Sequence, residues 1–212
     1  MTRPVVLLGA GGHGKVVLAA LQASGRTVVA ILDADSRRHG TTLSGVPVVG
    51  GDDELLRWTP AELEIANGIG STGAPAMRRD VFLRLSAQGW RFASVIHPTA
   101  IVAPDCRLDD GVQVMARAVM QPGCKISANS IVNTGAILDH DCVVGPHAHV
   151  APGAVLCGNV CVDAAAHVGA GATVIQNVSI GANAVVAAGA VVVRNVHEGM
   201  KVAGVPAREM VR

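Results

Sequence analysis

Aliphatic residues recur at every sixth position through the second half of the chain, and this period constrains the fold more than any other feature of the sequence. A period of six suits neither an α-helix nor a single amphipathic strand, whose side chains repeat about every 3.6 and every 2 residues. It suits a coil with three flat sides, in which three hexads make one turn and each aliphatic side chain stacks on its counterpart in the next turn. The seventeen positions are Ile96, Val102, Leu108, Val114, Met120, Ile126, Val132, Leu138, Val144, Val150, Leu156, Val162, Val168, Val174, Ile180, Val186 and Val192.

The position two residues before each aliphatic residue is small or Val, from Ser94 to Ala190, which lets the coil turn a corner. Cys106, Cys124 and Cys142 occupy this position at intervals of three hexads, so we expect them to form a ladder inside the coil. Such a ladder is either a metal site or a stack of small apolar side chains, and the second interpretation is favoured. The sequence has five cysteines and no Cys-x-x-Cys pair, so disulfide bonds are not expected.

Residues 1–92 follow a different pattern, in which strands and helices alternate. This alternation favours a small parallel sheet with helices on its faces. The sequence therefore predicts two domains: an α/β, Rossmann-like domain over residues 1–92 and a coil of hexapeptide repeats over residues 93–212. In the first domain we expect strands at Pro4–Gly9, Thr27–Asp33, Val46–Val49 and Glu64–Ile69, and helices at Lys15–Ser24 and Ala74–Gln88.

The segment Gly9–Gly14 has the pattern Gly-x-Gly-x-x-Gly between the first predicted strand and the first predicted helix. Glycines let the backbone approach a pyrophosphate closely, and the N-terminus of the helix favours its negative charge. Asp33, at the end of the next strand, follows Gly11 at the spacing that completes a dinucleotide-binding fingerprint. The residues predicted to bind the ligand are Gly11, Gly12, His13, Gly14, Asp33 and Asp35.

Three interpretations of the glycine-rich segment are open: a bound NAD-type cofactor, a nucleoside diphosphate that is part of another molecule, and a purely structural turn. The domain is too short to hold the second mononucleotide-binding half of an NAD-binding fold, so the second interpretation is favoured. His13 is unusual inside such a loop. It either donates to a phosphate or sugar hydroxyl or only fills the turn.

The charge balance is close to neutral, with 17 basic and 16 acidic residues and a net charge of +1. There is no Lys/Arg-rich run, so nucleic acid binding is not expected. The N-terminal residues lack the apolar core of a signal peptide. The longest apolar stretch, Ala184–Val193, is far shorter than the ~20 residues of a membrane span. We therefore expect a cytoplasmic protein that does not cross a membrane.

His140 lies two residues after an inward position, so its side chain is expected to project outward near a corner of the coil. Asp139 and Asp141 flank it, and the sequence leaves open which of them orients the imidazole. A carboxylate beside an imidazole fixes its tautomer and raises its basicity, as a general base requires when it takes a proton from an amine or a hydroxyl. His149 and His167 are three hexads apart and are expected to stack on one side of the coil.

The segment Gly9–Lys15 (GAGGHGK) and the repeats that begin with Ile96–Ala100 (IHPTA) together resemble the bacterial nucleotide-sugar N-acetyltransferases and the related sialic acid O-acetyltransferase-like proteins. The resemblance covers essentially the whole chain. It implies a left-handed parallel β-helix that binds acetyl-CoA, an N-terminal domain that binds a nucleotide-linked sugar, and a mechanism without a metal. It also implies a homotrimer with acetyl-CoA between neighbouring β-helices, and the outward residues Val191 and Val193 fit a buried outer face.

The resemblance also implies roles for individual residues of the coil. His140 is implied to be the catalytic base, followed by Asp141 where the family more often has Glu. Asn133 corresponds to a position that contacts the sugar. The residues expected to contact acetyl-CoA are His149, Gly158, whose N–H is the candidate donor to the oxyanion, and Arg208, whose charge fits the 3′-phosphate.

The predicted function is acetyl-CoA-dependent N-acetylation of a nucleotide-linked 4-amino-4,6-dideoxy sugar, such as a UDP- or GDP-linked sugar of the bacillosamine or perosamine type. The same base serves a hydroxyl, so O-acetylation of a sialic-acid-like sugar is one alternative, and a non-catalytic scaffold on the same fold is another. A zinc-dependent carbonic anhydrase of the γ class is disfavoured, because it requires two His residues five apart and the sequence has no such pair.

Overall fold

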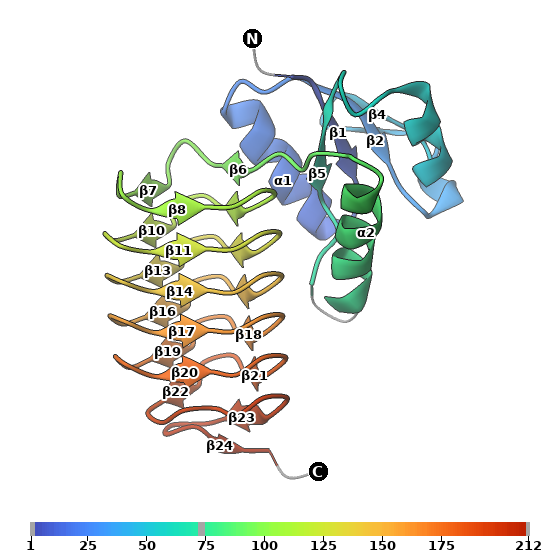
Figure 1. Ribbon diagram of the computed structural model, residues 1–212. Helices are drawn as coiled ribbons and strands as arrows, with labels where there is room; N and C mark the ends of the chain where they lie inside the picture. Colours follow the sequence, from blue (N-terminus) through green and yellow to red (C-terminus); the bar gives the residue numbers. More distant parts are fainter. Residues whose placement is uncertain (1–2, 72–74, 211–212) are drawn as a thin grey trace. The chain divides into compact units, whose positions relative to one another are not determined.

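The computed structural model describes residues 3–71 and 75–210 (Figure 1). The chain separates into two compact units, Met1–Pro98 and Thr99–Arg212. This division falls a few residues after the change of period expected between residues 92 and 93, because the first hexad, with the strand β6 (Val95–Ile96), is part of the first unit. None of the described helices is both long enough and apolar enough to cross a membrane.

Besides β6, the described part of the first unit contains a five-stranded sheet and four helical segments. Their bounds are β1 (Val5–Leu8), α1 (Gly12–Ala23), β2 (Val28–Leu32), η1 (Ser36–Arg38), β3 (Thr42–Leu43), β4 (Val46–Gly50), η2 (Asp52–Arg57), β5 (Glu64–Asn67) and α2 (Pro75–Ala87), where η denotes a 3₁₀ helix. The strand order is β3-β4-β2-β1-β5; β3 is antiparallel to β4 and the other pairs are parallel. In Figure 1, β5 lies between α1 and α2. The four predicted strands and the two predicted helices are all present, although Ala74, the expected start of the second helix, lies outside the described residues.

Helix α1 begins within the glycine-rich segment, earlier than the expected start at Lys15. Gly11 is its N-cap residue, and the N–H of Lys15 donates to the carbonyl of Gly11 at 3.0 Å, which closes the first turn. The second half of the segment therefore forms the helix N-terminus, where backbone N–H groups have no partner within the helix. The helix ends before Gly25, whose φ of +71° is the left-handed conformation that terminates helices, as predicted.

The second unit is built from two-residue strands, one for each hexad. The inward residue of the repeat is the second residue of every one of these strands. They are β7 (Ile101–Val102), β8 (Arg107–Leu108), β9 (Gln113–Val114), β10 (Val119–Met120), β11 (Lys125–Ile126), β12 (Ile131–Val132), β13 (Ile137–Leu138), β14 (Val143–Val144), β15 (His149–Val150), β16 (Val155–Leu156), β17 (Cys161–Val162), β18 (His167–Val168), β19 (Thr173–Val174), β20 (Ser179–Ile180), β21 (Val185–Val186) and β22 (Val191–Val192). The unit ends with β23 (Lys201–Ala203) and β24 (Arg208–Glu209).

These strands form three parallel sheets, which are the three sides of a β-helix (Figure 1). One side carries β7, β10, β13, β16, β19 and β22, the second carries β8, β11, β14, β17 and β20, and the third carries β9, β12, β15, β18, β21, β23 and the antiparallel β24. From β7 to β22 the strands pair at a separation of three hexads, so that Met120 lies opposite Leu138 and Leu138 opposite Leu156. The inward residues from Val114 to Val192 are at most 1% exposed. The pairing confirms the turn of three hexads that the period predicts.

The three cysteines of the repeat form the expected ladder inside the coil. Cys124 and Cys142 are fully buried and Cys106 is partly buried. Their thiols donate to backbone carbonyls in the same wall, at 3.3 Å from Cys106 to Gln121, 3.2 Å from Cys124 to Asp139 and 3.3 Å from Cys142 to Cys157. The cysteines thus pack as small core residues whose thiol protons are satisfied. Within residues 3–71 and 75–210, no group of three or more His, Cys, Asp or Glu side chains is placed to hold a metal ion.

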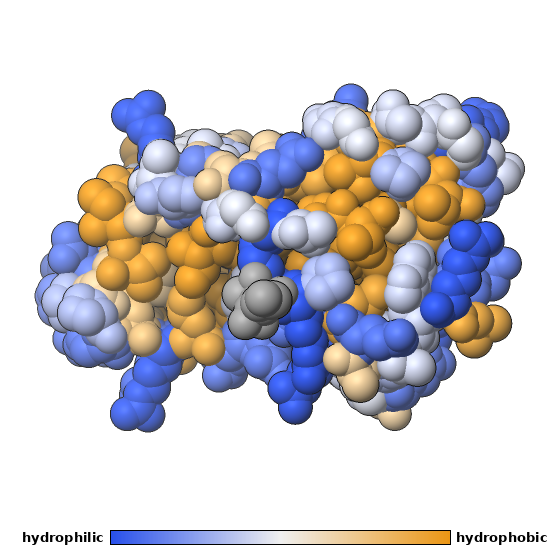
Figure 2. Space-filling view, turned by 90° about the horizontal axis from the view of Figure 1, so that it is seen from above, coloured by the Kyte–Doolittle hydropathy of each residue, from blue (hydrophilic) through white to orange (hydrophobic). Residues whose placement is uncertain are grey.

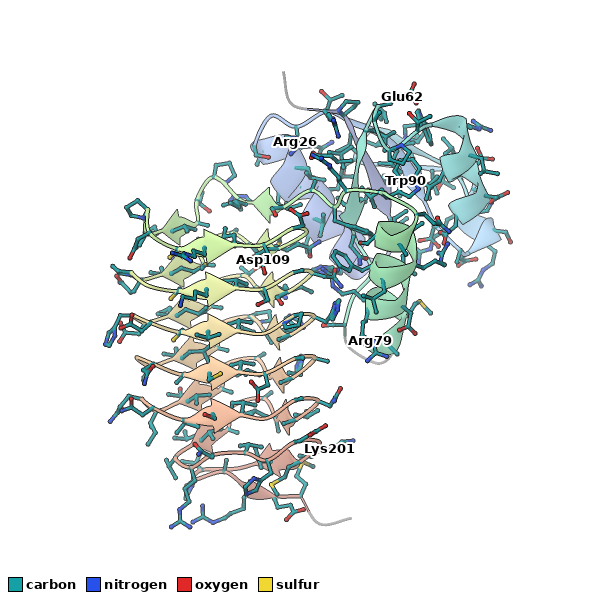
Figure 3. All side chains as sticks on the ribbon, in the orientation of Figure 1. Arg26, Glu62, Arg79, Trp90, Asp109 and Lys201 are labelled. Atoms are coloured by element: carbon teal, nitrogen blue, oxygen red, sulfur yellow. The ribbon has the colours of Figure 1, made fainter. Side chains whose placement is uncertain are left out.

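The surface carries apolar side chains as well as charged ones. Seen from above, apolar areas are bordered by polar side chains (Figure 2). Along the β-helix, polar side chains project outward from the coils, and Lys201 is one of them (Figure 3). The inward positions thus hold the fold, whereas the outward positions include both exposed residues and buried ones, among them Gln113, Ile131 and His149.

Candidate active site

His140 and Asp141 lie in the turn between β13 and β14, at a corner of the β-helix. Nδ1 of His140 lies 2.8 Å from Oδ2 of Asp141, and Oδ1 of Asp139 accepts the backbone N–H of His140, also at 2.8 Å. The two carboxylates therefore have different contacts: Asp141 contacts the imidazole and Asp139 fixes the backbone. This geometry answers the question that the sequence leaves open.

The backbone of the turn explains why a short acid is suited to this position. Asp141 has a φ of +61°, in the left-handed region that Asn, Asp and Gly adopt more readily than longer residues. The equivalent residues of neighbouring turns are Gly123, Asn159 and Asn177, and each of them also has a positive φ. Although Asp is one methylene shorter than the Glu that is more common in the resembling family, its carboxylate reaches the imidazole at ordinary hydrogen-bond distance.

The surrounding carboxylates raise the pKa of His140. The hydrogen bond to Asp141 contributes most, and the nearby charge of Asp139 adds to it. With its Nδ1–H donated to Asp141, neutral His140 presents Nε2 as a proton acceptor. The side chain of His140 is exposed, as a base that meets a substrate requires.

Gly158, one turn further along the same corner, packs against the imidazole of His140. A Cβ atom at Gly158 would lie only 2.5 Å from Nε2 of His140, so any other residue would displace the ring. The carbonyl of Gly158 accepts the N–H of Asn177 at 3.1 Å, whereas no described residue accepts the N–H of Gly158 itself. The N–H of Gly158 is thus a backbone donor without an acceptor among the described residues, and it belongs to the residue that packs against Nε2 of His140.

Asn133, His149 and His167 form a second cluster on another part of the coil. Nδ2 of Asn133 lies 3.0 Å from Nε2 of His149, and the rings of His149 and His167 meet edge to face with their centroids 4.9 Å apart. Strands β15 and β18 pair in register at these histidines, which confirms that they stack. Their side of the coil differs from the corner of His140, so one chain does not gather all the predicted residues into one site.

Arg208 lies in β24, near the C-terminal end of the coil. It is exposed and lines a shallow cavity of about 150 Å³. Arg194 lines the same cavity, and the sequence analysis did not identify it because the hexad pattern does not distinguish it from other outward residues. Two cations and one acid, Glu209, therefore line this cavity, and the excess of positive charge suits an anionic group.

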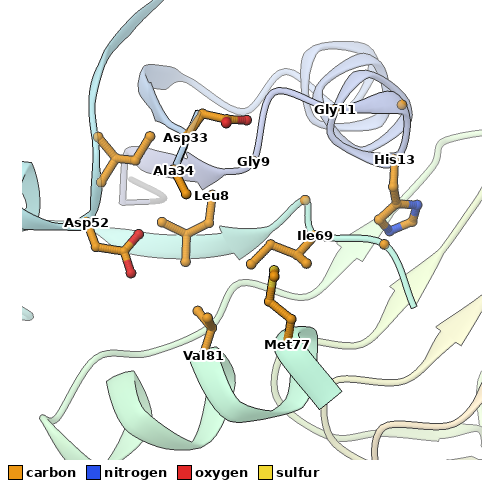
Figure 4. A pocket seen from close by; sticks show the side chains of 14 residues that line it. Leu8, Gly9, Gly11, His13, Asp33, Ala34, Asp52, Ile69, Met77 and Val81 are labelled. Atoms are coloured by element: carbon orange, nitrogen blue, oxygen red, sulfur yellow. The ribbon is translucent and has the colours of Figure 1, made fainter. Parts of the chain in front are cut away.

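The glycine-rich segment borders a cavity of about 590 Å³ in the first unit (Figure 4). A Cβ atom at Gly14 would overlap with the carbonyl oxygen of Gly9, so Gly14 is required for the close approach of α1 to the preceding loop. A Cβ atom at Gly11 or Gly12 would meet nothing within 4 Å, because these two residues face open space. The lining residues are Leu8, Gly9, Gly11, Gly12, His13, Leu32, Asp33, Ala34, Asp52, Gly68, Ile69, Gly70, Met77 and Val81.

The two acids predicted to bind the ligand differ in their positions. Asp33 lines the cavity, but its carboxylate accepts the N–H of Ala10 at 2.6 Å and that of Asp35 at 2.8 Å, so it holds the glycine-rich segment in place. Asp35 is not among the lining residues. Its carboxylate contacts Arg37, and the hydrogen bonds from Arg37 lower the pKa of Asp35 to about 2. Asp52 and the segment Gly68–Gly70 line the cavity without having been identified from the sequence, which shows no motif there.

Comparisons with known proteins agree with this architecture. The family model of the PglD N-terminal domain matches residues 4–85. PerB from Caulobacter crescentus, in complex with CoA and GDP-perosamine, is 40% identical and has a TM-score of 0.91, over 98% of this chain and 97% of that chain. A perosamine N-acetyltransferase from the same organism, with a histidine replaced by asparagine and the same two ligands bound, is 39% identical with a TM-score of 0.91, over 99% of this chain and 97% of that chain.

The acetyltransferase domain of PglB from Neisseria gonorrhoeae, in complex with acetyl coenzyme A, is 36% identical with a TM-score of 0.90, over 99% of this chain and 100% of that chain. The chain matches no curated protein sequence. The identities and the coverage of both chains place the protein among the acyltransferases built on hexapeptide repeats. Within that class, the chain belongs to the PglD-like family of nucleotide-sugar N-acetyltransferases.

Replacing Asp141 by Asn should lower the pKa of His140 toward its ordinary value of about 6.5, because the substitution removes the charge of the acceptor at Nδ1. Asn also tolerates the left-handed backbone at this position. An NMR titration of the His140 side chain measures the shift. Asp139→Asn is the matched control, because it removes an equal charge that does not contact the ring; it should lower the pKa less. A larger effect of Asp139→Asn would contradict the assignment of Asp141 as the orienting residue.

Proposed function

We propose that the protein transfers the acetyl group of acetyl-CoA to the 4-amino group of a nucleoside-diphosphate-linked 4-amino-4,6-dideoxy sugar. The observation that carries this proposal is the exposed imidazole of His140, which Asp141 holds at Nδ1 and which packs against Gly158, whose N–H no described residue accepts. The perosamine N-acetyltransferase of Caulobacter crescentus holds CoA and GDP-perosamine, and this chain is similar to it over nearly its whole length. GDP-perosamine is therefore the first substrate to test.

In the proposed mechanism, Nε2 of His140 accepts a proton from the substrate amine as the nitrogen attacks the thioester carbonyl. The N–H of Gly158 donates to the oxyanion of the tetrahedral intermediate. When the carbon–sulfur bond breaks, the CoA thiolate leaves and takes the proton from the imidazolium, which restores the neutral base. Since only neutral His140 accepts a proton, the rate should rise with pH through the pKa of His140, and Asp141 sets that pKa.

A histidine variant of the Caulobacter enzyme supports a catalytic role for a histidine in this family. Asparagine and alanine variants of that enzyme both retain CoA and GDP-perosamine. The replaced histidine is thus not needed to hold either ligand. In this chain, His140 is the histidine whose contacts suit such a role, because its Nδ1 has a carboxylate partner and its side chain is exposed.

The N-terminal unit supplies the proposed nucleotide site. Gly11, Gly12 and His13 present the N-terminus of α1 to the cavity, where its N–H groups and dipole favour a diphosphate. Gly14 and Asp33 determine the shape of this site through their contacts with the loop.

The remaining ligand contacts are proposed for residues of the coil. Asn133 is proposed to contact the sugar, and His149, Gly158 and Arg208 are proposed to contact acetyl-CoA. We also propose that the reaction takes place in the cytoplasm.

A homotrimer is proposed for two reasons. One side of the β-helix is largely apolar on its outside. Within one chain, the corner of His140 also lies apart from the cluster that contains Asn133 and His149. The outward residues of this side are Ile101, Val119, Ile137, Val155, Thr173 and Val191, whereas those of the second side are mostly charged or small: Arg107, Lys125, Val143, Cys161 and Ser179. An apolar ladder of this kind is typical of a buried interface. A neighbouring copy would bring a second set of residues to the corner of His140.

The first test measures CoA release from acetyl-CoA with GDP-, UDP- and dTDP-linked 4-amino sugars and with sialic acid. We expect turnover on one of the amino sugars and a loss of at least about 10²-fold in kcat for His140→Asn, as for other general bases, with the affinity for both ligands retained. Turnover on sialic acid alone would replace N-acetylation by O-acetylation. Undiminished kcat in His140→Asn would exclude this residue as the base.

A pair of glycine variants separates binding from folding in the nucleotide site. Gly11→Val should weaken nucleotide-sugar binding by at least about tenfold, because the new side chain enters the space of the diphosphate without meeting protein atoms. Acetyl-CoA binding and thermal stability should be unchanged. Gly14→Ala is the contrasting variant, since its Cβ would meet the carbonyl of Gly9, and it should lower the thermal stability. Normal nucleotide-sugar binding by a folded Gly11→Val protein would argue against a diphosphate at this helix terminus.

Light scattering in solution tests the assembly. The protein should have three times the mass of one chain, and Ile137→Glu should dissociate it, because the substitution buries a charge in the apolar interface. Lys125→Glu, which changes an outward residue on the second side, is the control and should leave the mass unchanged. A monomer with full activity would contradict the proposed trimeric site.

A further inference from the structure

The nucleotide cavity contains a carboxylate that the dinucleotide-binding fingerprint does not include. Asp52, the first residue of η2, lines the same cavity as the glycine-rich segment. In Figure 4 the Asp52 side chain lies at the left and His13 at the right, and Leu8 and Val81 lie between them in the view. If the diphosphate lies at the N-terminus of α1, the cavity extends from the phosphates toward Asp52 between apolar side chains, which suit the faces of a planar base.

The two other acids of this region contact either the backbone of the loop or Arg37. Both carboxylate oxygens of Asp33 accept backbone N–H groups, and Asp35 contacts Arg37 outside the lining of the cavity. Among the described residues that line the cavity, Asp33 and Asp52 are the only acids. Asp52 is thus the one whose carboxylate is not fixed by the backbone of the loop.

An ion pair orients the Asp52 side chain. Oδ2 of Asp52 accepts a hydrogen bond from Nη2 of Arg84, in helix α2. The pair joins η2 to α2, two elements that both contribute to the cavity wall, since Val81 lies one turn before Arg84 in α2. An ionised carboxylate has about four acceptor sites, so the contact with Arg84 leaves Asp52 able to accept further hydrogen bonds.

We propose that Asp52 contacts the nucleobase of the bound nucleotide and selects guanine; this inference rests on the proposed function. Guanine presents two adjacent donors, N1–H and the N2 amino group, which match the two oxygens of a carboxylate. Uracil and thymine present one N–H between two carbonyl oxygens, and adenine presents an acceptor beside its amino group. A carboxylate only accepts hydrogen bonds, so it attracts the edge of guanine and repels the lone pairs of the other bases.

The experiment measures the binding of GDP, IDP, UDP and ADP to the full chain by calorimetry. The wild-type protein should bind GDP at least about tenfold more tightly than UDP or ADP. IDP, which lacks the N2 amino group, should bind more weakly than GDP. Asp52→Asn should reduce the ratio of GDP to UDP affinity by at least about tenfold and should narrow the difference between GDP and IDP, because an amide offers one acceptor in place of two.

Asp53→Asn is the matched control. It removes the same charge from the next residue of η2, and Asp53 does not line this cavity. All four affinities should be unchanged in this variant. Thermal stability and acetyl-CoA binding establish that both variants are folded.

Three outcomes would overturn the inference. An equal loss of GDP, UDP and ADP affinity in Asp52→Asn would assign Asp52 to the ribose or to the shape of the site. A wild-type protein that binds UDP as tightly as GDP would show that the cavity does not select guanine, while leaving the proposed acetyl transfer intact. Absence of binding for all four nucleotides would remove the proposed nucleotide site and with it the role of Asp52.

Discussion

The stacking of inward aliphatic side chains from one turn to the next is the interaction on which the rest of the β-helix depends. Because Leu138 lies between Met120 and Leu156 of the neighbouring turns, a change of register by one residue would turn every inward side chain outward. The same register fixes the corners above one another. His140 and Gly158 therefore meet, although three hexads separate them in the sequence, and the packing of the core determines the geometry of the proposed active site.

The corners restrict which residues can carry the chemistry. The position of Asp141 has a left-handed backbone in every turn from Gly123 to Asn177, so it accepts Gly, Asn or Asp more readily than a longer acid. His140, one residue earlier, projects outward and takes no part in the core. A corner thus supplies an imidazole and its carboxylate on adjacent residues of a rigid backbone, at little cost to the stability of the coil.

Features that repeat along the chain or that depend on neighbouring residues could be predicted from the sequence. The hexad period predicted the strands of the coil, the length of its turn, the burial of the inward residues from Val114 to Val192 and the stacking of His149 on His167. It was wrong for Ile96, at the start of the repeats, which is 40% exposed. Local apolar runs predicted four strands of the first unit, but not β3, which has only two residues and no repeat around it. Asp52 and Arg84 could not be paired from the sequence, because neither belongs to a pattern and 32 residues separate them.

The role of Asp33 shows why a motif predicts the place of a ligand better than its identity. In the dinucleotide-binding fingerprint, the acid at the end of the second strand binds a ribose hydroxyl. Here that carboxylate is turned onto the N–H groups of Ala10 and Asp35, and it shapes the loop that faces the proposed diphosphate site. Recognition of the rest of the nucleotide then falls to elements beyond the fingerprint. The segment Gly68–Gly70 and Asp52 follow later strands of the sheet, where the fold brings them to the same cavity.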